Sequence, residues 1–263
     1  MTRHLAGLAL DDYGTADTRP PLVLLHGLTF NRAMWGPALV ALHRIDPGRR
    51  VLAIDLPGHG GSPRWQAYDT ESVADGVHRA VTAAGIQSPV VVGHSLAAIV
   101  ATVYAARFPS RGVVNVDQAL QTEPFMRFVQ PVADRLRGPD FASVWQMFVA
   151  SMHMEMLSDD AQELLRSTMD ARQELVLGYW AEVLDRPSDE VAARVAAGLA
   201  ALREASVPYL VVAGHDLEPG YESWLRETCP QATVDVLPRS GHFPHIAHPD
   251  RFAEWLASTR RWS

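Results

Sequence analysis

The sequence predicts an α/β protein in which helices cover both faces of a mostly parallel β-sheet. Short apolar runs, most of them four or five residues long, alternate with longer stretches of helical periodicity. Continuous apolar runs are typical of strands buried on both faces, and their alternation with helices is typical of parallel sheets. The alternation stops between about residues 118 and 186, where only helical patterns occur.

The elements can be assigned in chain order from these patterns. The predicted strands are 22–26, 51–54, 90–92, 113–116, 209–213 and 233–237. The predicted helices between them are 34–45, 70–84, 96–107, 189–205, 221–228 and 250–260. The first dozen residues precede a Tyr13-Gly14 turn, and they predict a short antiparallel pair at one edge of the sheet.

A helical insertion interrupts this order. Its predicted helices are 124–136, 141–156, 160–171 and 173–184, with joins near Pro139 and at 158–160. We therefore expect a core made of residues 1–117 and 187–263, and a helical cap, or lid, made of residues 118–186. The insertion is rich in methionine and aromatic residues, which suit either the core of a helical layer or the wall of an apolar pocket.

The amino-acid composition excludes several classes of enzyme chemistry. The chain has 263 residues, 48% of them hydrophobic, as expected for one large globular domain with an insertion. It contains no lysine, so all 23 basic residues are arginine. Schiff-base chemistry and a phosphate-loop lysine are therefore excluded. The single cysteine, Cys229, excludes an internal disulfide and a cysteine-based zinc cluster.

Charge and hydropathy suggest where the protein works and with what. The net charge of −7 argues against a nucleic-acid surface, and no apolar run approaches the roughly 18 residues of a membrane span. The first ten residues lack the apolar centre of a signal peptide. We expect a cytoplasmic monomer or homodimer with a small-molecule substrate, and without a membrane or nucleic-acid partner, a cofactor or a metal.

The strongest chemical signal is Gly93-His94-Ser95-Leu96-Ala97, which lies between an apolar strand and a helix. A sharp strand-to-helix turn exposes its central side chain at the end of the sheet, and small flanking residues allow the strand and helix to pack closely. The N-terminus of the helix also favours developing negative charge. Ser95 is therefore the candidate nucleophile.

A serine nucleophile needs a base, and His242 is the candidate. It lies in Ser240-Gly241-His242-Phe243, between the last predicted strand and the last predicted helix. By contrast, His26, His59 and His94 stand beside glycines and are interpreted as residues that organise the backbone.

Two aspartates compete to orient His242. Asp216 follows the strand 209–213, and Asp117 follows the strand 113–116. The carboxyl ends of parallel strands meet at one edge, so either side chain can reach that edge. We predict Asp216 as the orienting acid, with Asp117 as the rival or as a residue that lines the pocket.

Acyl transfer also needs N–H donors for an oxyanion. Leu96 follows the nucleophile and supplies one N–H, and Leu28 follows Gly27 in the first strand-to-helix loop and supplies the second. Thr29 either adds a hydroxyl or caps the turn.

With these residues in this order, the chain resembles the α/β-hydrolase superfamily over essentially its whole length. The His26-Gly27 pair and the 55–62 run, DLPGHGGS, add to the resemblance. It implies the α/β-hydrolase fold: about eight strands in a mostly parallel sheet flanked by helices, with a helical cap inserted after the sixth strand. One departure is Ala97, where the family usually has glycine.

The resemblance and the triad together predict a serine hydrolase that acts on a small, largely apolar ester, thioester or lactone through an acyl-enzyme. A C–C bond hydrolase or a cofactor-independent oxygenase could use the same triad, and a small-molecule receptor with a retained triad is the alternative of another class. The candidate substrate-binding residues are His26, Gly27, Thr29, Phe125, Phe128, Trp145, Met152, Trp180 and Phe243.

Overall fold

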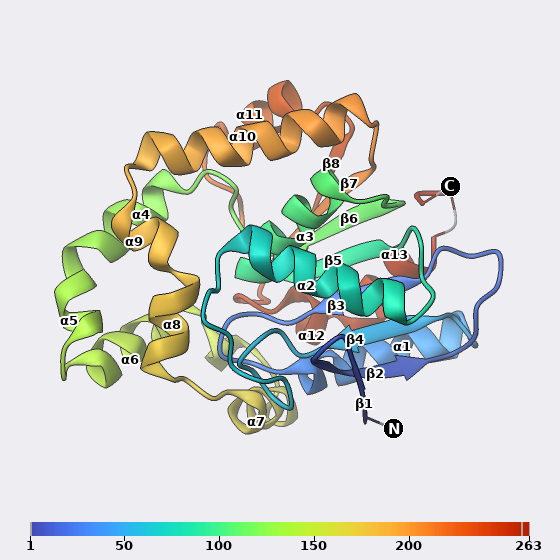
Figure 1. Ribbon diagram of the computed structural model, residues 1–263, viewed down its shortest axis with the longest axis horizontal. Helices are drawn as coiled ribbons and strands as arrows, with labels where there is room; N and C mark the ends of the chain where they lie inside the picture. Colours follow the sequence, from blue (N-terminus) through green and yellow to red (C-terminus); the bar gives the residue numbers. More distant parts are fainter. Residues whose placement is uncertain (1, 259, 263) are drawn as a thin grey trace.

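A computed structural model describes residues 2–258 and 260–262, and its centre is an eight-stranded sheet (Figure 1). The strands are β1 (Thr2–Leu5), β2 (Leu8–Tyr13), β3 (Leu22–Leu25), β4 (Val51–Ile54), β5 (Val90–His94), β6 (Gly112–Val116), β7 (Tyr209–Ala213) and β8 (Ala232–Val236). Their spatial order is β1-β2-β4-β3-β5-β6-β7-β8. Only the β1–β2 and β2–β4 pairings are antiparallel, which confirms the predicted mostly parallel sheet.

Helices connect the strands on both faces. Those of the core are η1 (Arg32–Trp35), α1 (Gly36–Ile45), α2 (Thr70–Ala83), α3 (Leu96–Arg107), α10 (Ser188–Glu204), α11 (Tyr221–Thr228), α12 (Pro244–Ala247) and α13 (Pro249–Ala257). Those between β6 and α10 are α4 (Glu123–Val129), η2 (Gln130–Val132), α5 (Ala133–Arg137), α6 (Phe141–Ser151), η3 (Met154–Met156), α7 (Asp159–Thr168), α8 (Gln173–Tyr179) and α9 (Ala181–Asp185).

Alternate residues of the buried strands enter two separate cores, as the two-residue period of a strand requires. Val23 and Leu25 of β3 pack with the side of the sheet that α2 and α3 cover, whereas Leu22 and Leu24 pack with the side that α1 and α13 cover. β3 and β4 are therefore apolar at every position because both of their faces are buried.

The segment between β6 and α10 is entirely helical and extends beyond the end of the sheet, on the left in Figure 1. This confirms the predicted helical insertion after the sixth strand. The predicted helix 124–136 breaks at Pro131, whose ring removes a backbone donor, and 141–156 breaks at His153, which has φ of 53°.

The last predicted helix, 250–260, is also divided differently. Pro244 and Pro249 each stand in the first turn of a helix, so α12 and α13 begin earlier than predicted, and α13 ends at Ala257. Residue 259 of that prediction lies outside the described residues, as do residues 1 and 263 of the predicted core. None of the described helices combines the length and apolar character needed to cross a membrane.

Candidate active site

Ser95 stands between β5 and α3 in a strained backbone conformation, with φ of 53° and ψ of −135°. Its N–H donates to the Val116 carbonyl of the neighbouring strand at 2.8 Å, which fixes the turn against β6. A Cβ on Gly93 would lie 2.2 Å from the Ala97 carbonyl oxygen, so the strand and helix can approach this closely only with glycine there. Ala97 itself is fully buried, and the turn forms with its methyl group in place.

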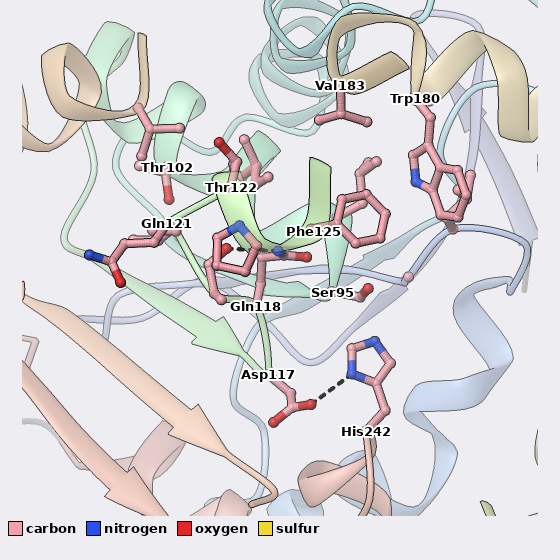
Figure 2. A pocket seen from close by; sticks show the side chains of 18 of the residues that line it. Ser95, Thr102, Asp117, Gln118, Gln121, Thr122, Phe125, Trp180, Val183 and His242 are labelled. Carbon is pink, nitrogen blue, oxygen red and sulfur yellow. Dashed lines mark hydrogen bonds and ion pairs between the residues drawn. The ribbon is translucent and has the colours of Figure 1, made fainter. Parts of the chain in front are cut away.

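His242 lies after β8 and is held through its backbone by two elements. Its N–H donates to the Met152 carbonyl of the helical insertion at 2.9 Å. Its own carbonyl accepts from His94 Nε2 at 2.8 Å. Figure 2 shows the imidazole between Asp117 and Ser95, with Nδ1 toward the carboxylate and its other nitrogen toward the serine hydroxyl.

The carboxylate that meets His242 belongs to Asp117. His242 Nδ1 lies 2.7 Å from Asp117 Oδ2, and Asp117 Oδ1 accepts from the Gly214 N–H at 2.7 Å. Burial alone would raise the pKa of this carboxyl, but the hydrogen bond and charge of His242 and the Gly214 N–H together lower it. Asp117 is thus an ionised acceptor that orients the imidazole.

The prediction of Asp216 as the orienting acid is therefore wrong. Asp216 is solvent-exposed in the loop after β7, and its neighbour His215 is the residue that turns toward Asp117, with Nδ1 3.5 Å from Oδ1. The strand order explains the outcome: β6 lies directly beside β5, which carries Ser95, whereas β7 lies one strand further away.

Three other histidines around the site form hydrogen bonds with backbone groups through their side chains, as the sequence predicted. His26 Nε2 accepts from Leu56 N–H at 2.9 Å, and His59 Nε2 accepts from Thr29 N–H at 3.1 Å. Burial lowers the pKa of His26 to about 4 and that of His59 to about 3. Burial also lowers the pKa of His94 well below its usual value, and nearby His242 and His245 lower it further. These rings are neutral at physiological pH.

A cavity of about 440 Å³ opens above Ser95 and His242. It lies between the sheet and the helical insertion, and it is largely apolar. Of the predicted substrate-binding residues, those that line it are Gly27, Phe125, Trp145, Met152 and Trp180. The aromatic side chains pack on one another, with the Phe125 and Trp180 rings 5.2 Å apart and the Trp145 and Trp180 rings 5.8 Å apart.

Four predicted substrate-binding residues are not among those lining the cavity, and each has a structural reason. His26 and Thr29 are fully buried: the His26 ring accepts from the Leu56 N–H, and the Thr29 N–H donates to the His59 ring. Phe243 is fully buried against Phe30, with ring centroids 5.6 Å apart. Phe128 is 48% exposed on the outside of the insertion, although its ring contacts that of Phe148.

The sequence interpretation missed the polar part of the cavity wall. Gln118, Gln121 and Thr122 follow β6 and lie to the left of Ser95 in Figure 2, with Phe125 above Ser95 and Trp180 at the upper right. Glu71 and Arg194 also line the cavity. These residues come from separate segments and form no motif, so only the assembled fold brings them together.

Two backbone donors beside Ser95 are unused. Leu28 and Leu96 both line the cavity, and neither backbone N–H has a hydrogen-bond acceptor among the described residues. No hydrogen bond joins Ser95 Oγ to His242 among the described contacts, an arrangement common before a substrate tightens the site.

Comparison with known proteins agrees with this geometry. The model of the alpha/beta hydrolase family matches residues 22–255, so the chain belongs to that family and is an enzyme of the hydrolase type. The chain is 30% identical over 260 residues to a pimeloyl-[acyl-carrier protein] methyl ester esterase of Pectobacterium carotovorum subsp. carotovorum, a match that covers 89% of this chain and 91% of that protein.

Other relatives have other names. The chain is 28% identical over 255 residues to a 2-succinyl-6-hydroxy-2,4-cyclohexadiene-1-carboxylate synthase of Serratia proteamaculans, covering 92% of this chain and 93% of that protein. Among solved structures, a thermophilic esterase from Thermogutta terrifontis superposes with a TM-score of 0.74 at 22% identity, over the full length of both chains. That likeness concerns the fold.

Proposed function

We propose that the protein is a serine hydrolase that cleaves a small, largely apolar carboxylic ester, with thioesters and lactones as related substrates. The observation that carries the proposal is the hydrogen bond between His242 Nδ1 and Asp117 in a cavity that also exposes Ser95. With Nδ1–H donated to Asp117, the second ring nitrogen is left to accept the serine proton.

The proposed reaction runs through an acyl-enzyme. His242 takes the proton of Ser95 as Oγ attacks the ester carbonyl, and the protonated imidazole then returns that proton to the leaving alcohol. Water, deprotonated by His242, releases the acid and restores Ser95. The unused N–H groups of Leu28 and Leu96 would hold the oxyanion in both steps.

The cavity wall supports an apolar substrate. Phe125, Trp145 and Trp180 gather in the insertion, which we propose acts as a cap (residues 118–186) over the reacting serine. Relatives named methyl ester esterases support ester cleavage over the other reactions that this triad can carry out.

The test is turnover of p-nitrophenyl hexanoate together with labelling by a fluorophosphonate. We expect Ser95→Ala to lower kcat/KM by about 10³-fold or more and to abolish the label, which mass spectrometry should locate on Ser95. Ser110→Ala is the matched control, because Ser110 precedes β6 at the opposite end of the sheet. Equal turnover in wild type and Ser95→Ala would refute the nucleophile.

A further inference from the structure

A charged cluster forms part of the cavity wall where α2, α9 and α10 meet. Arg194 of α10 bonds Glu71 of α2 through Nη2, and its Nη1 lies 2.9 Å from Glu182 Oε1 of α9. Thr70 Oγ1 completes the cluster at 3.4 Å from Glu182 Oε2. All four side chains line the same cavity as Ser95.

The cavity wall carries more acidic side chains than arginine side chains. Its charged lining residues, apart from the Asp117 that serves His242, are Glu71, Glu182, Glu218 and Arg194. Among the described lining residues Arg194 is the one arginine, and the chain has no lysine. Because both terminal nitrogens of Arg194 are already engaged by carboxylates, no unpaired arginine of the described wall is left for a carboxylate on a substrate.

The charged side chains of Glu182 and Arg194 are partly buried, so solvent screens their interactions less than it would at the surface. The side chain of Glu182 is 20% exposed, and burial raises the pKa of its carboxyl while Arg194 opposes that rise. Coulomb interactions are stronger at such sites than in bulk water. A carboxylate entering this region would face Glu71 and Glu182, or would have to break an existing ion pair.

We infer that Glu71 and Glu182 are specificity determinants that restrict the enzyme to esters with an uncharged acyl chain, by occupying Arg194 and repelling anions. The inference rests on the proposed function, because it names the substrate class of the same site. It assigns selectivity to Glu71, Glu182 and Arg194, which lie on three separate helices.

The test compares three p-nitrophenyl esters of equal chain length: hexanoate, the adipate monoanion, and monomethyl adipate, which is polar but uncharged. For the wild type we expect kcat/KM for hexanoate and for monomethyl adipate to exceed that for the adipate anion by about 10-fold or more, which corresponds to about 1.4 kcal/mol. We expect Glu71→Gln/Glu182→Gln to shrink that ratio several-fold, because Arg194 becomes free to bind the anion.

The control variant is Glu204→Gln/Glu227→Gln, which removes two exposed charges from α10 and α11 outside the cavity lining. It should keep the wild-type ratio. Thermal unfolding checks that each variant folds, and Glu182→Gln alone replaces the double variant if the latter does not. A wild-type ratio near one, or the same change of ratio in both double variants, would overturn the inference.

A binding measurement separates this inference from the proposed hydrolysis. In Ser95→Ala, Trp145 and Trp180 report occupancy of the cavity through tryptophan fluorescence. We expect methyl hexanoate to bind about 10-fold more tightly than the monomethyl adipate anion, and the Glu71→Gln/Glu182→Gln change to remove most of that difference. Equal binding of the two ligands would contradict the charge selectivity even if no ester were hydrolysed.

Discussion

At the scale of single residues, two of the three proposed catalytic residues, Ser95 and Asp117, have a strained backbone conformation. Ser95 has φ of 53° and Asp117 has φ of 57°, both in the region that non-glycine residues rarely adopt. Each costs about 1–3 kcal/mol, and such residues persist only where the surroundings fix them. Here strand-end hydrogen bonds do so: Ser95 N–H donates to Val116, and Asp117 N–H donates to Val212 at 2.9 Å.

The two aspartates give a direct test of the orienting acid. We expect Asp117→Asn to lower kcat/KM for a neutral ester by about 10³- to 10⁴-fold, because an amide no longer stabilises the imidazolium that forms during attack. Asp216→Asn should stay within about twofold of wild type, since that side chain is exposed. Ester turnover measures both, and a larger loss in Asp216→Asn would refute the assignment.

This acid also marks where prediction from the sequence reached its limit. The positions of Ser95 and His242 at this edge of the sheet were predictable because each lies in a local pattern, a strand-turn-helix for one and a loop between the last strand and helix for the other. Asp117 and Asp216 both follow a buried strand, so local pattern cannot rank them. The choice depends on the β5-β6-β7 order and on a loop that turns Asp216 outward, and both are properties of the assembled sheet.

At the scale of elements, a buried polar network ties the end of β6 to its neighbours. Asn115 Oδ1 accepts from Gln118 N–H at 3.0 Å, and Asn115 Nδ2 donates to the Gln118 carbonyl at 2.9 Å. Nδ2 is also 3.3 Å from the Tyr209 hydroxyl of β7, which in turn lies 2.8 Å from Thr102 Oγ1 of α3. The turn that carries Asp117 is therefore clamped from three elements.

We predict that Asn115→Ala loosens this turn and lowers kcat/KM by about 10-fold or more, because a small displacement of Asp117 misaligns His242. The readout that separates positioning from general damage is the split between kcat and KM: kcat should fall, whereas KM should stay near the wild-type value. Thr102→Val is the comparison, since it leaves both bonds between Asn115 and Gln118 intact. An unchanged kcat with lower thermal stability would mean that Asn115 is merely structural.

The sequence predicted that the insertion is helical, but it did not predict where its helices end. The periodicity of 141–156 is genuine, yet α6 ends at Ser151, and the Met152 carbonyl then binds the His242 N–H. That break serves a contact with a loop some ninety residues later in the chain, which no local pattern encodes. The central strands, by contrast, are buried on both faces, so each is marked in the sequence by a continuous apolar run.

At the scale of the whole molecule, the fold buries histidines in their neutral form. Burial lowers the pKa of His26 to about 4 and those of His59 and His245 to about 3. In the unfolded chain the pKa of each histidine would be about 6.5. Between those values the unfolded state binds protons that the folded state does not, so stability must fall as the pH falls through this window.

We therefore predict that the free energy of unfolding is highest above about pH 6.5 and declines steeply toward pH 4, by about 1.4 kcal/mol per pH unit for each such histidine. Urea unfolding at half-unit pH steps measures the slope. His245→Phe should lower that slope by one proton without loss of stability at pH 7, because neither ring nitrogen of His245 has a hydrogen-bond partner among the described residues, and its ring packs on Trp35. A slope in His245→Phe equal to that of wild type would show that His245 is already protonated in the folded protein, and that burial does not hold it neutral.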